Sequence, residues 1–169
     1  MPITSDEFRN TMRHFPAGVT LVTVKAGEET HGLTVSAFVS VSPTPPLICV
    51  IIDHRSRTHE LLERSDAVFA VNILREDQKE LSVRFAYVKD DRFAVGDWTT
   101  AKTGAPILRD ALAWLDCTVY SRHTAGTHTL YIGEVQATHV PQPELTPLVY
   151  WNRDYRALMP LPEKANTSE

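Results

Sequence analysis

The sequence predicts a mainly β fold, an antiparallel β-barrel with a few peripheral α-helices. About seven stretches rich in β-branched and apolar residues have the length of strands, whereas only two or three short stretches have helical features. The strand candidates do not alternate with helices in the way that the βαβ units of a parallel sheet require. The 169 residues suffice for one domain with a core and contain no repeat or linker, so residues 1–169 are expected to form a single domain.

The first half of the chain is expected to contribute one helix and three strands. A capping-box spacing at residues 4–7, followed by apolar residues at helical intervals, predicts a helix that ends at Pro16. Uninterrupted β-branched and apolar runs predict strands at 18–25, 31–42 and 46–52, and proline-rich and polar turns separate them.

The second half begins with a helix, which Ser56 is expected to cap, over residues 58–64. A strand follows at 67–74 and a helix at 75–86, whose acidic residues come early and basic residues late, as the helix dipole favours. Residues 87–106 are poorly patterned and are expected to form a long loop. Further strands are expected at 112–122, 128–140 and 148–151, and the tail from Pro160 is expected to be frayed.

Charge and hydropathy exclude several classes of partner and location. The 17 basic and 21 acidic residues give a net charge of −4, so neither nucleic acid nor an anionic membrane is expected as the main partner. The longest apolar run, 47–52, is far too short to span a bilayer, and the acidic, polar N-terminus is unlike a signal peptide. The cysteines, Cys49 and Cys117, form no CxxC pair and are expected to be buried free thiols of a cytoplasmic protein.

Several catalytic motifs are absent from the sequence. The seven glycines form no GxG pair, so the dinucleotide fingerprint of a βαβ unit and the phosphate loop of nucleotide hydrolases are both missing. There is no GxSxG elbow, and the seven histidines and two cysteines do not have metal-ligand spacing, so no metal is expected. The groups that remain to build a site are backbone groups, hydroxyls and a few cations. These are compatible with binding a bulky planar cofactor.

One candidate site is an anion site at residues 54–59, which read His-Arg-Ser-Arg-Thr-His where a strand passes into a helix. Free N–H groups at the helix start, two hydroxyls and two arginines together favour a phosphate. The alternative is that Ser56 only caps the helix while Arg55 and Arg57 are solvated.

A second candidate site is the segment 32–38, where small and hydroxyl residues interrupt an apolar strand pattern. Small side chains let a flat ligand approach the backbone, whose N–H and C=O groups can contact the edge of a heterocycle. The alternative is an ordinary edge strand.

Four segments in register resemble the flavin reductase family with an FMN-binding split barrel, the reductase components of two-component flavin-dependent monooxygenases. These segments read FPAGVTLVTV (15–24), GLTVSAFVSVSPTPPL (32–47), FAVNIL (69–74) and HTLYIGEV (128–135), and the resemblance extends over about residues 6–158. It implies a homodimeric Greek-key split barrel that binds FMN or FAD and reduces it with NADH or NADPH. Reduced flavin then diffuses to a separate monooxygenase.

The resemblance also implies the residues of the site. The isoalloxazine is expected against the strand at Thr34, Val35, Ser36 and Ala37, and the helix end at Arg84, Phe85 and Ala86 approaches the flavin. The ribityl chain and phosphate are expected along Ile51, Ile52, Asp53, Ser56, Arg57 and Thr58.

On the nicotinamide side the resemblance implies His128 as the catalytic residue, with Tyr150 and Arg153 near it. Many relatives carry Gly-Asp-His before the last long strand, whereas this chain has Gly126, Thr127 and His128, so the acid beside the histidine is missing. Hydride passes from nicotinamide C4 to flavin N5, and the protein has only to stack the two rings and stabilise the negative charge that grows on the flavin.

Two alternatives remain open beside the flavin reductase that releases its product. One is a reductase that retains its flavin and passes electrons to another acceptor. The other is a non-catalytic flavin-binding or flavin-sensing barrel, which the altered Thr127 favours.

Overall fold

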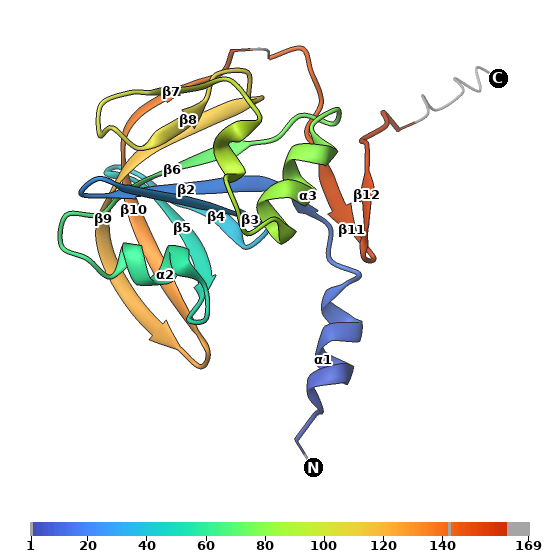
Figure 1. The fold of residues 1–169 in the computed structure, drawn as a ribbon. Helices are drawn as coiled ribbons and strands as arrows, with labels where there is room; N and C mark the ends of the chain where they lie inside the picture. Colours follow the sequence, from blue (N-terminus) through green and yellow to red (C-terminus); the bar gives the residue numbers. More distant parts are fainter. Residues whose placement is uncertain (1, 142, 162–169) are drawn as a thin grey trace.

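The computed structural model describes residues 2–141 and 143–161, and these residues fold mainly into β-strands (Figure 1). Three α-helices and one short 3₁₀-helix are present in this part of the chain: α1 Ser5–Met12, α2 Arg57–Leu62, α3 Lys79–Tyr87 and η1 Arg92–Ala94. The strands are β1 Ala17–Gly18, β2 Thr20–Ala26, β3 Glu29–Val35, β4 Phe38–Pro43, β5 Pro46–Asp53, β6 Val68–Ile73, β7 Trp98–Thr100, β8 Pro106–Leu108, β9 Ala113–Ala125, β10 His128–His139, β11 Val149–Trp151 and β12 Asp154–Arg156.

Seven strands form one antiparallel sheet in the order β3-β2-β6-β9-β10-β5-β4. Strands β3 and β4 follow each other in the chain but are the two edges of this order, so the sheet curls until its edges are joined by Ser36 and Ala37 alone. The predicted antiparallel barrel with peripheral helices is confirmed, and it is an open, split barrel. Two small sheets, β1-β11-β12 and β7-β8, lie outside it.

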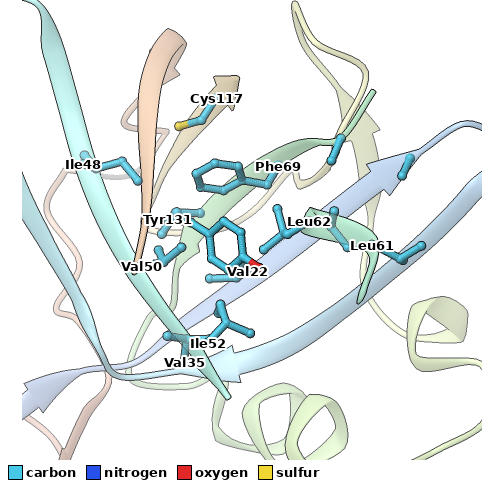
Figure 2. Packing of buried hydrophobic residues seen from close by; sticks show 14 residues of the cluster. Val22, Val35, Ile48, Val50, Ile52, Leu61, Leu62, Phe69, Cys117 and Tyr131 are labelled. Carbon is cyan, nitrogen blue, oxygen red and sulfur yellow. The ribbon is translucent and has the colours of Figure 1, made fainter. Parts of the chain in front are cut away.

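The main core fills the inside of the barrel (Figure 2). Phe69 of β6 and Tyr131 of β10 are fully buried, and Val22, Ile52 and Leu62 surround them from the neighbouring strands and α2. The Tyr131 hydroxyl satisfies its hydrogen-bonding capacity by donating to Glu63 Oε1 at 2.5 Å, as a buried phenol requires. This core holds the strands that carry the site.

The local helix signals are confirmed. Thr4 and Glu7 form a complete capping box at the start of α1, and this helix ends before Pro16. The Ser56 side chain accepts a hydrogen bond from the His59 N–H and so caps α2.

Three predicted boundaries are wrong. The strand expected at 31–42 is two strands, because the chain crosses the split of the barrel between them. The helix expected from residue 75 starts at Lys79, because the Gln78 side chain accepts a hydrogen bond from the Arg75 N–H and holds a turn there. The expected loop at 87–106 contains η1 and β7.

The tail expected to be frayed lies largely outside the described residues. Pro160 and Leu161 have no regular secondary structure, and residues 162–169 are not described.

Candidate functional site

The split of the barrel brings β3 against α3. The Thr34 hydroxyl donates to the carbonyl oxygen of Ser82 at 2.6 Å, which ties the end of β3 to the helix. Gly32 lets the two elements approach each other, since a Cβ there would lie 2.7 Å from the Phe85 ring. The glycine of the predicted flavin segment therefore serves the contact between β3 and α3.

A hollow of about 330 Å³ opens between β3, α3 and the β11–β12 hairpin, and we call it the tyrosine hollow. Its lining includes Thr34, Ser36, Lys79, Ser82, Ala86, Tyr150, Arg153 and Tyr155. The Tyr155 and Ser82 hydroxyls lie 2.9 Å apart, and the Lys79 ammonium lies 5.5 Å from the centre of the Tyr155 ring. Aromatic, hydroxyl and small side chains thus face one space, as a planar heterocycle requires.

A second hollow, of about 440 Å³, adjoins the first and carries positive charge; we call it the basic hollow. Its lining is His31, Leu33, Thr34, Arg55, Ser56, Arg57, Phe85, Ala86, Lys89 and Arg92. Thr34 and Ala86 line both hollows, so the two are continuous. An elongated ligand with a planar end and an anionic extension would fit across them.

The hydroxyls predicted to bind phosphate are engaged within the protein. Ser56 Oγ donates to the Asp53 carbonyl at 2.8 Å and accepts from the His59 N–H at 3.1 Å, so Ser56 caps α2. Thr58 is fully buried, and its hydroxyl lies 2.8 Å from His31 Nδ1. The Arg57 guanidinium binds Glu29 and Glu60.

His31 was not predicted from the sequence, and its environment fixes its tautomer. Arg92 can only donate, so its hydrogen bond to His31 Nε2 at 3.2 Å makes that nitrogen the acceptor. Nδ1 then carries the proton and donates to Thr58. Burial, followed by the nearby charges of Arg92 and Arg57, lowers the pKa of His31 to about 4. His31 is therefore a neutral residue that links α2 to η1 through its hydrogen bonds to Thr58 and Arg92.

The predicted flavin-binding residues divide into two groups. Thr34, Ser36, Ser56, Arg57, Phe85 and Ala86 line the two hollows. Five of the remaining seven have other surroundings: Val35 and Ile52 are in the core, Ala37 is exposed on the link between the edges, Ile51 is half-buried on β5, and Asp53 binds Arg55. That ion pair is the main reason why the pKa of Asp53 is lowered.

Arg84 lines neither the tyrosine hollow nor the basic hollow, and its side chain holds the segment that follows α3. Its guanidinium donates to the carbonyl oxygens of Asp91 and Arg92 at 2.6 and 3.1 Å. Lys89 and Arg92, whose side chains this segment presents to the basic hollow, were missed because they lie in the poorly patterned stretch. The basic residues at 89 and 92 were the signal that could have found them.

The structure does not bring the three predicted nicotinamide-side residues together. Tyr150 and Arg153 line the tyrosine hollow. His128 begins β10, opposite Asp53 of β5, and Figure 1 shows the β9–β10 turn well apart from the β11–β12 hairpin. The Thr127 hydroxyl lies 2.9 Å from His128 Nδ1, where the missing acid of the resembled motif would stand.

Residues 12–159 match the model of the flavin reductase like domain family. The flavin reductase (NADH) of Kitasatospora aureofaciens is 42% identical, and the match covers 98% of this chain and 87% of that protein. The actinorhodin polyketide dimerase of Streptomyces coelicolor is also 42% identical, with 89% and 84% covered. The reductase component of an FADH(2)-dependent resorcinol hydroxylase from a Rhizobium species is 40% identical, with 90% and 87% covered.

Among solved structures, the flavin reductase PheA2 in its native state superposes on this chain with a TM-score of 0.84 at 36% identity. The superposition covers 94% of this chain and 100% of that structure.

Proposed function

This chain belongs to the flavin reductase like domain family, and from that premise we propose the ligands, the assembly and the residues of its reaction. It is an oxidoreductase, the flavin reductase that supplies reduced flavin to a partner monooxygenase. We propose that the whole chain, residues 1–169, acts as one such domain. Its ligands are FMN or FAD together with NADH or NADPH.

The single observation that supports this proposal is the continuity of the tyrosine hollow with the basic hollow. A flavin nucleotide has a planar ring joined through a ribityl chain to phosphate, and the two hollows offer aromatic, hydroxyl and cationic groups in that order. The residues present therefore fit a flavin.

When bound, the nicotinamide and flavin supply the redox chemistry themselves, a hydride passing between their rings. The chain has to bind and orient the rings. Thr34 and Ser82 both line the tyrosine hollow, and the hydrogen bond from the Thr34 hydroxyl to the Ser82 carbonyl oxygen holds them together. Lys79 and Arg153 supply positive charge there, which stabilises negative charge on a reduced ring.

We propose the flavin phosphate in the basic hollow, beside Ser56 and Arg57. In the described chain, the Lys89 ammonium has no ion pair, so it can bind a phosphate without breaking another contact. A charge-assisted hydrogen bond of this kind contributes about 1.5–3 kcal/mol. Lys89→Gln should therefore weaken FMN about tenfold or more and leave riboflavin nearly unchanged.

The experiment that tests the function is the steady-state oxidation of NADH with and without added flavin. Turnover that rises with free flavin supports a reductase that releases its product, and turnover with flavin that does not exchange supports the alternative that retains it. Equal activity after the flavin is stripped contradicts the mechanism. Lys102→Gln, an exposed lysine between β7 and β8, is the matched control for Lys89→Gln.

We propose a homodimer as the working assembly. No residue of α1 is buried; Phe8 and Met12 on this helix are 55% and 46% exposed, and Phe15, just after it, is 69% exposed. Together with Trp151, they line a groove of about 330 Å³ between α1 and the β11–β12 hairpin. A second copy that covered this apolar face would remove it from water. A monomer in light scattering at micromolar concentration would contradict this.

We propose the cytoplasm as the location. Cys49 and Cys117 are free and buried, as expected in a reducing compartment. Within the described ranges, no helix has the length and apolar character needed to cross a membrane.

A further inference from the structure

Two histidines flank the part of the chain that lines the basic hollow on its α2 side. The segment 54–59 leads from β5 into the first turn of α2, and its middle residues 55–57 line that hollow. His54 and His59, at its two ends, line neither the basic hollow nor the tyrosine hollow. Their Nε2 atoms lie 3.0 and 3.2 Å from one atom, the hydroxyl oxygen of Thr129 on β10, and their ring centres are 4.7 Å apart. Both ends of the segment are therefore held by the same hydroxyl.

Thr129 can hold both rings because β10 fixes its position from either side. It pairs with Ile52 of β5 and with Thr124 of β9, and it is 2% exposed. A hydroxyl has one donor and two acceptor sites, so it can bind two imidazoles at once, whereas a methyl group in its place could bind neither. Both rings are half-buried, so water would replace a lost partner only in part.

The His59 ring is also anchored to the core. It packs edge-on against the fully buried Tyr131, with ring centres 6.0 Å apart. Its Nε2 lies 3.9 Å from Glu63 Oε1, the carboxylate oxygen to which the Tyr131 hydroxyl donates. Thr129 and its two histidines therefore join the end of β5 and the start of α2 to the closely packed inside of the barrel.

The hydrogen bonds of Ser56 stay within residues 53–59, so they shape the turn without orienting it against the barrel. Two other contacts help to orient it: the His54 N–H donates to the Thr127 carbonyl at 3.1 Å, and the Thr58 hydroxyl is held from β3. Removal of the shared hydroxyl should therefore leave the turn formed and the barrel intact, but hold the residues that line the hollow less firmly.

We infer that Thr129 is a positioning residue for the phosphate of the flavin nucleotide. It lines neither hollow, and it acts through His54 and His59, which hold Ser56 and Arg57 at the basic hollow. An anion site that is already ordered loses less freedom when the phosphate binds, so fixing the segment raises the affinity. The inference rests on the proposed function, since it takes the phosphate to lie in the basic hollow.

The test compares FMN with riboflavin, which lacks the phosphate, in titrations of the purified protein followed by flavin fluorescence. Thr129→Val removes the hydroxyl and nearly keeps the size of the side chain. It should weaken FMN about five- to tenfold, as the loss of one or two hydrogen bonds implies, and change riboflavin less than about twofold. In the steady-state oxidation of NADH, the KM for FMN should rise by a similar factor, while kcat at saturating FMN stays within about twofold.

Two further variants separate positioning from a general loss of structure. Thr129→Ser retains the hydroxyl and should keep FMN affinity within about twofold of that of the unmodified chain. Thr124→Val makes the same exchange as Thr129→Val at an exposed residue of β9, directly opposite Thr129, and should leave the affinities for both flavins unchanged.

His54→Leu keeps the test decisive if Thr129→Val does not fold. It removes one of the two rings and leaves the buried hydroxyl in contact with His59. It should weaken FMN about two- to fivefold, as the loss of a single hydrogen bond implies, and spare riboflavin.

Three outcomes overturn the inference and leave the flavin reductase in place. These are equal weakening of FMN and riboflavin, unchanged FMN affinity in Thr129→Val or in His54→Leu, and a Thr129→Ser variant that binds FMN as weakly as Thr129→Val. Absence of NADH turnover by the unmodified chain with FMN would instead contradict the proposed function itself, and the inference with it.

Discussion

Two glycines allow a comparison of two parts of the barrel. We call the continuous strand pairing around β9 and β10 the closed wall, and the split beside β3 the open wall. Gly133 of β10 lies in the closed wall, where a Cβ would meet the Phe69 ring at 2.4 Å and Cys117 at 3.2 Å. Gly32 of β3 lies at the split, where a Cβ would meet the Phe85 ring at 2.7 Å. The difference lies in what the displaced ring touches next: Phe69 belongs to the core, whereas Phe85 also lines the basic hollow. Residues of the closed wall therefore affect the stability of the fold, whereas residues of the open wall affect both stability and ligand binding.

Gly133→Ala should cause the largest loss of unfolding free energy, through overpacking in the closed wall. The Phe69 ring is fully buried and has no space into which to move, so overpacking should cost about 3 kcal/mol or more of unfolding free energy. Flavin affinity of the remaining folded protein should stay the same. Urea unfolding measures the first and a flavin titration the second.

Gly32→Ala is the counterpart on the open wall. It should cost about 1–3 kcal/mol and also weaken flavin binding, because Phe85 must shift toward the hollow. If Gly133→Ala and Gly32→Ala weaken flavin binding equally, the contrast between the two walls is wrong.

Asp116→Ala should give the next largest effect, again confined to the closed wall. The Asp116 carboxylate is fully buried in β9 and accepts hydrogen bonds from the Thr103 N–H at 2.8 Å and from the Thr103 hydroxyl. Its removal leaves a part-buried N–H without a partner, at a cost of about 1–3 kcal/mol.

Asp116→Asn keeps one acceptor oxygen and is the control for this substitution, with a smaller loss expected. Unchanged stability in the alanine variant would show that the connection between β7 and β8 does not depend on this anchor. Thermal unfolding at pH 7 is the measurement.

The sequence predicted what is encoded locally. The cap at Ser56 and the strand predicted at 67–74 depend on residues that are neighbours in the sequence. The structure contains both, the strand as β6 Val68–Ile73. The break at Ser36 and Ala37 could not be predicted, because both flanking segments favour strands and only closure of the barrel decides where the chain bends.

The same limit applies to the site. His31 contacts Thr58 and Arg92 across 27 and 61 positions of the chain, and no periodicity connects them. The family resemblance supplied the flavin segments but not this contact, which arises when β3, α2 and η1 pack together. Residues that line the groove through tertiary contacts therefore had to come from the structure.

His31 should make the open wall sensitive to acid. The pKa of His31 is lowered in the folded protein to about 4 from its ordinary 6.5, so the unfolded chain binds more protons between these values. Its contribution to stability is complete above pH 6.5 and is lost as the pH falls toward 4. We expect a loss of about 1 kcal/mol, less than the full shift implies, because the side chain is half-exposed and solvent screens its neighbours.

The measurement is the unfolding free energy of the unmodified chain and of His31→Gln at pH 7 and pH 4.5. The glutamine variant should lose less stability over this interval. Equal losses would mean that His31 is protonated without penalty when the protein is folded.

His128→Ala should have the smallest effect, and it tests whether the β9–β10 turn belongs to the reaction at all. His128 is half-buried, and among the described residues its side chain is within hydrogen-bonding distance only of the neighbouring Thr127 hydroxyl, so its loss should not destabilise the barrel measurably. If it contacts the nicotinamide, the KM for the coenzyme should rise or kcat should fall by a few fold, while flavin affinity stays unchanged. The effect is modest because a neutral hydroxyl orients the imidazole less strongly than a carboxylate would. Thr127→Asp sharpens the comparison, since it restores a charged partner and should lower the KM. Equal loss of flavin affinity and rate in His128→Ala would instead mark His128 as part of the β5–β10 wall that supports Asp53 and Arg55.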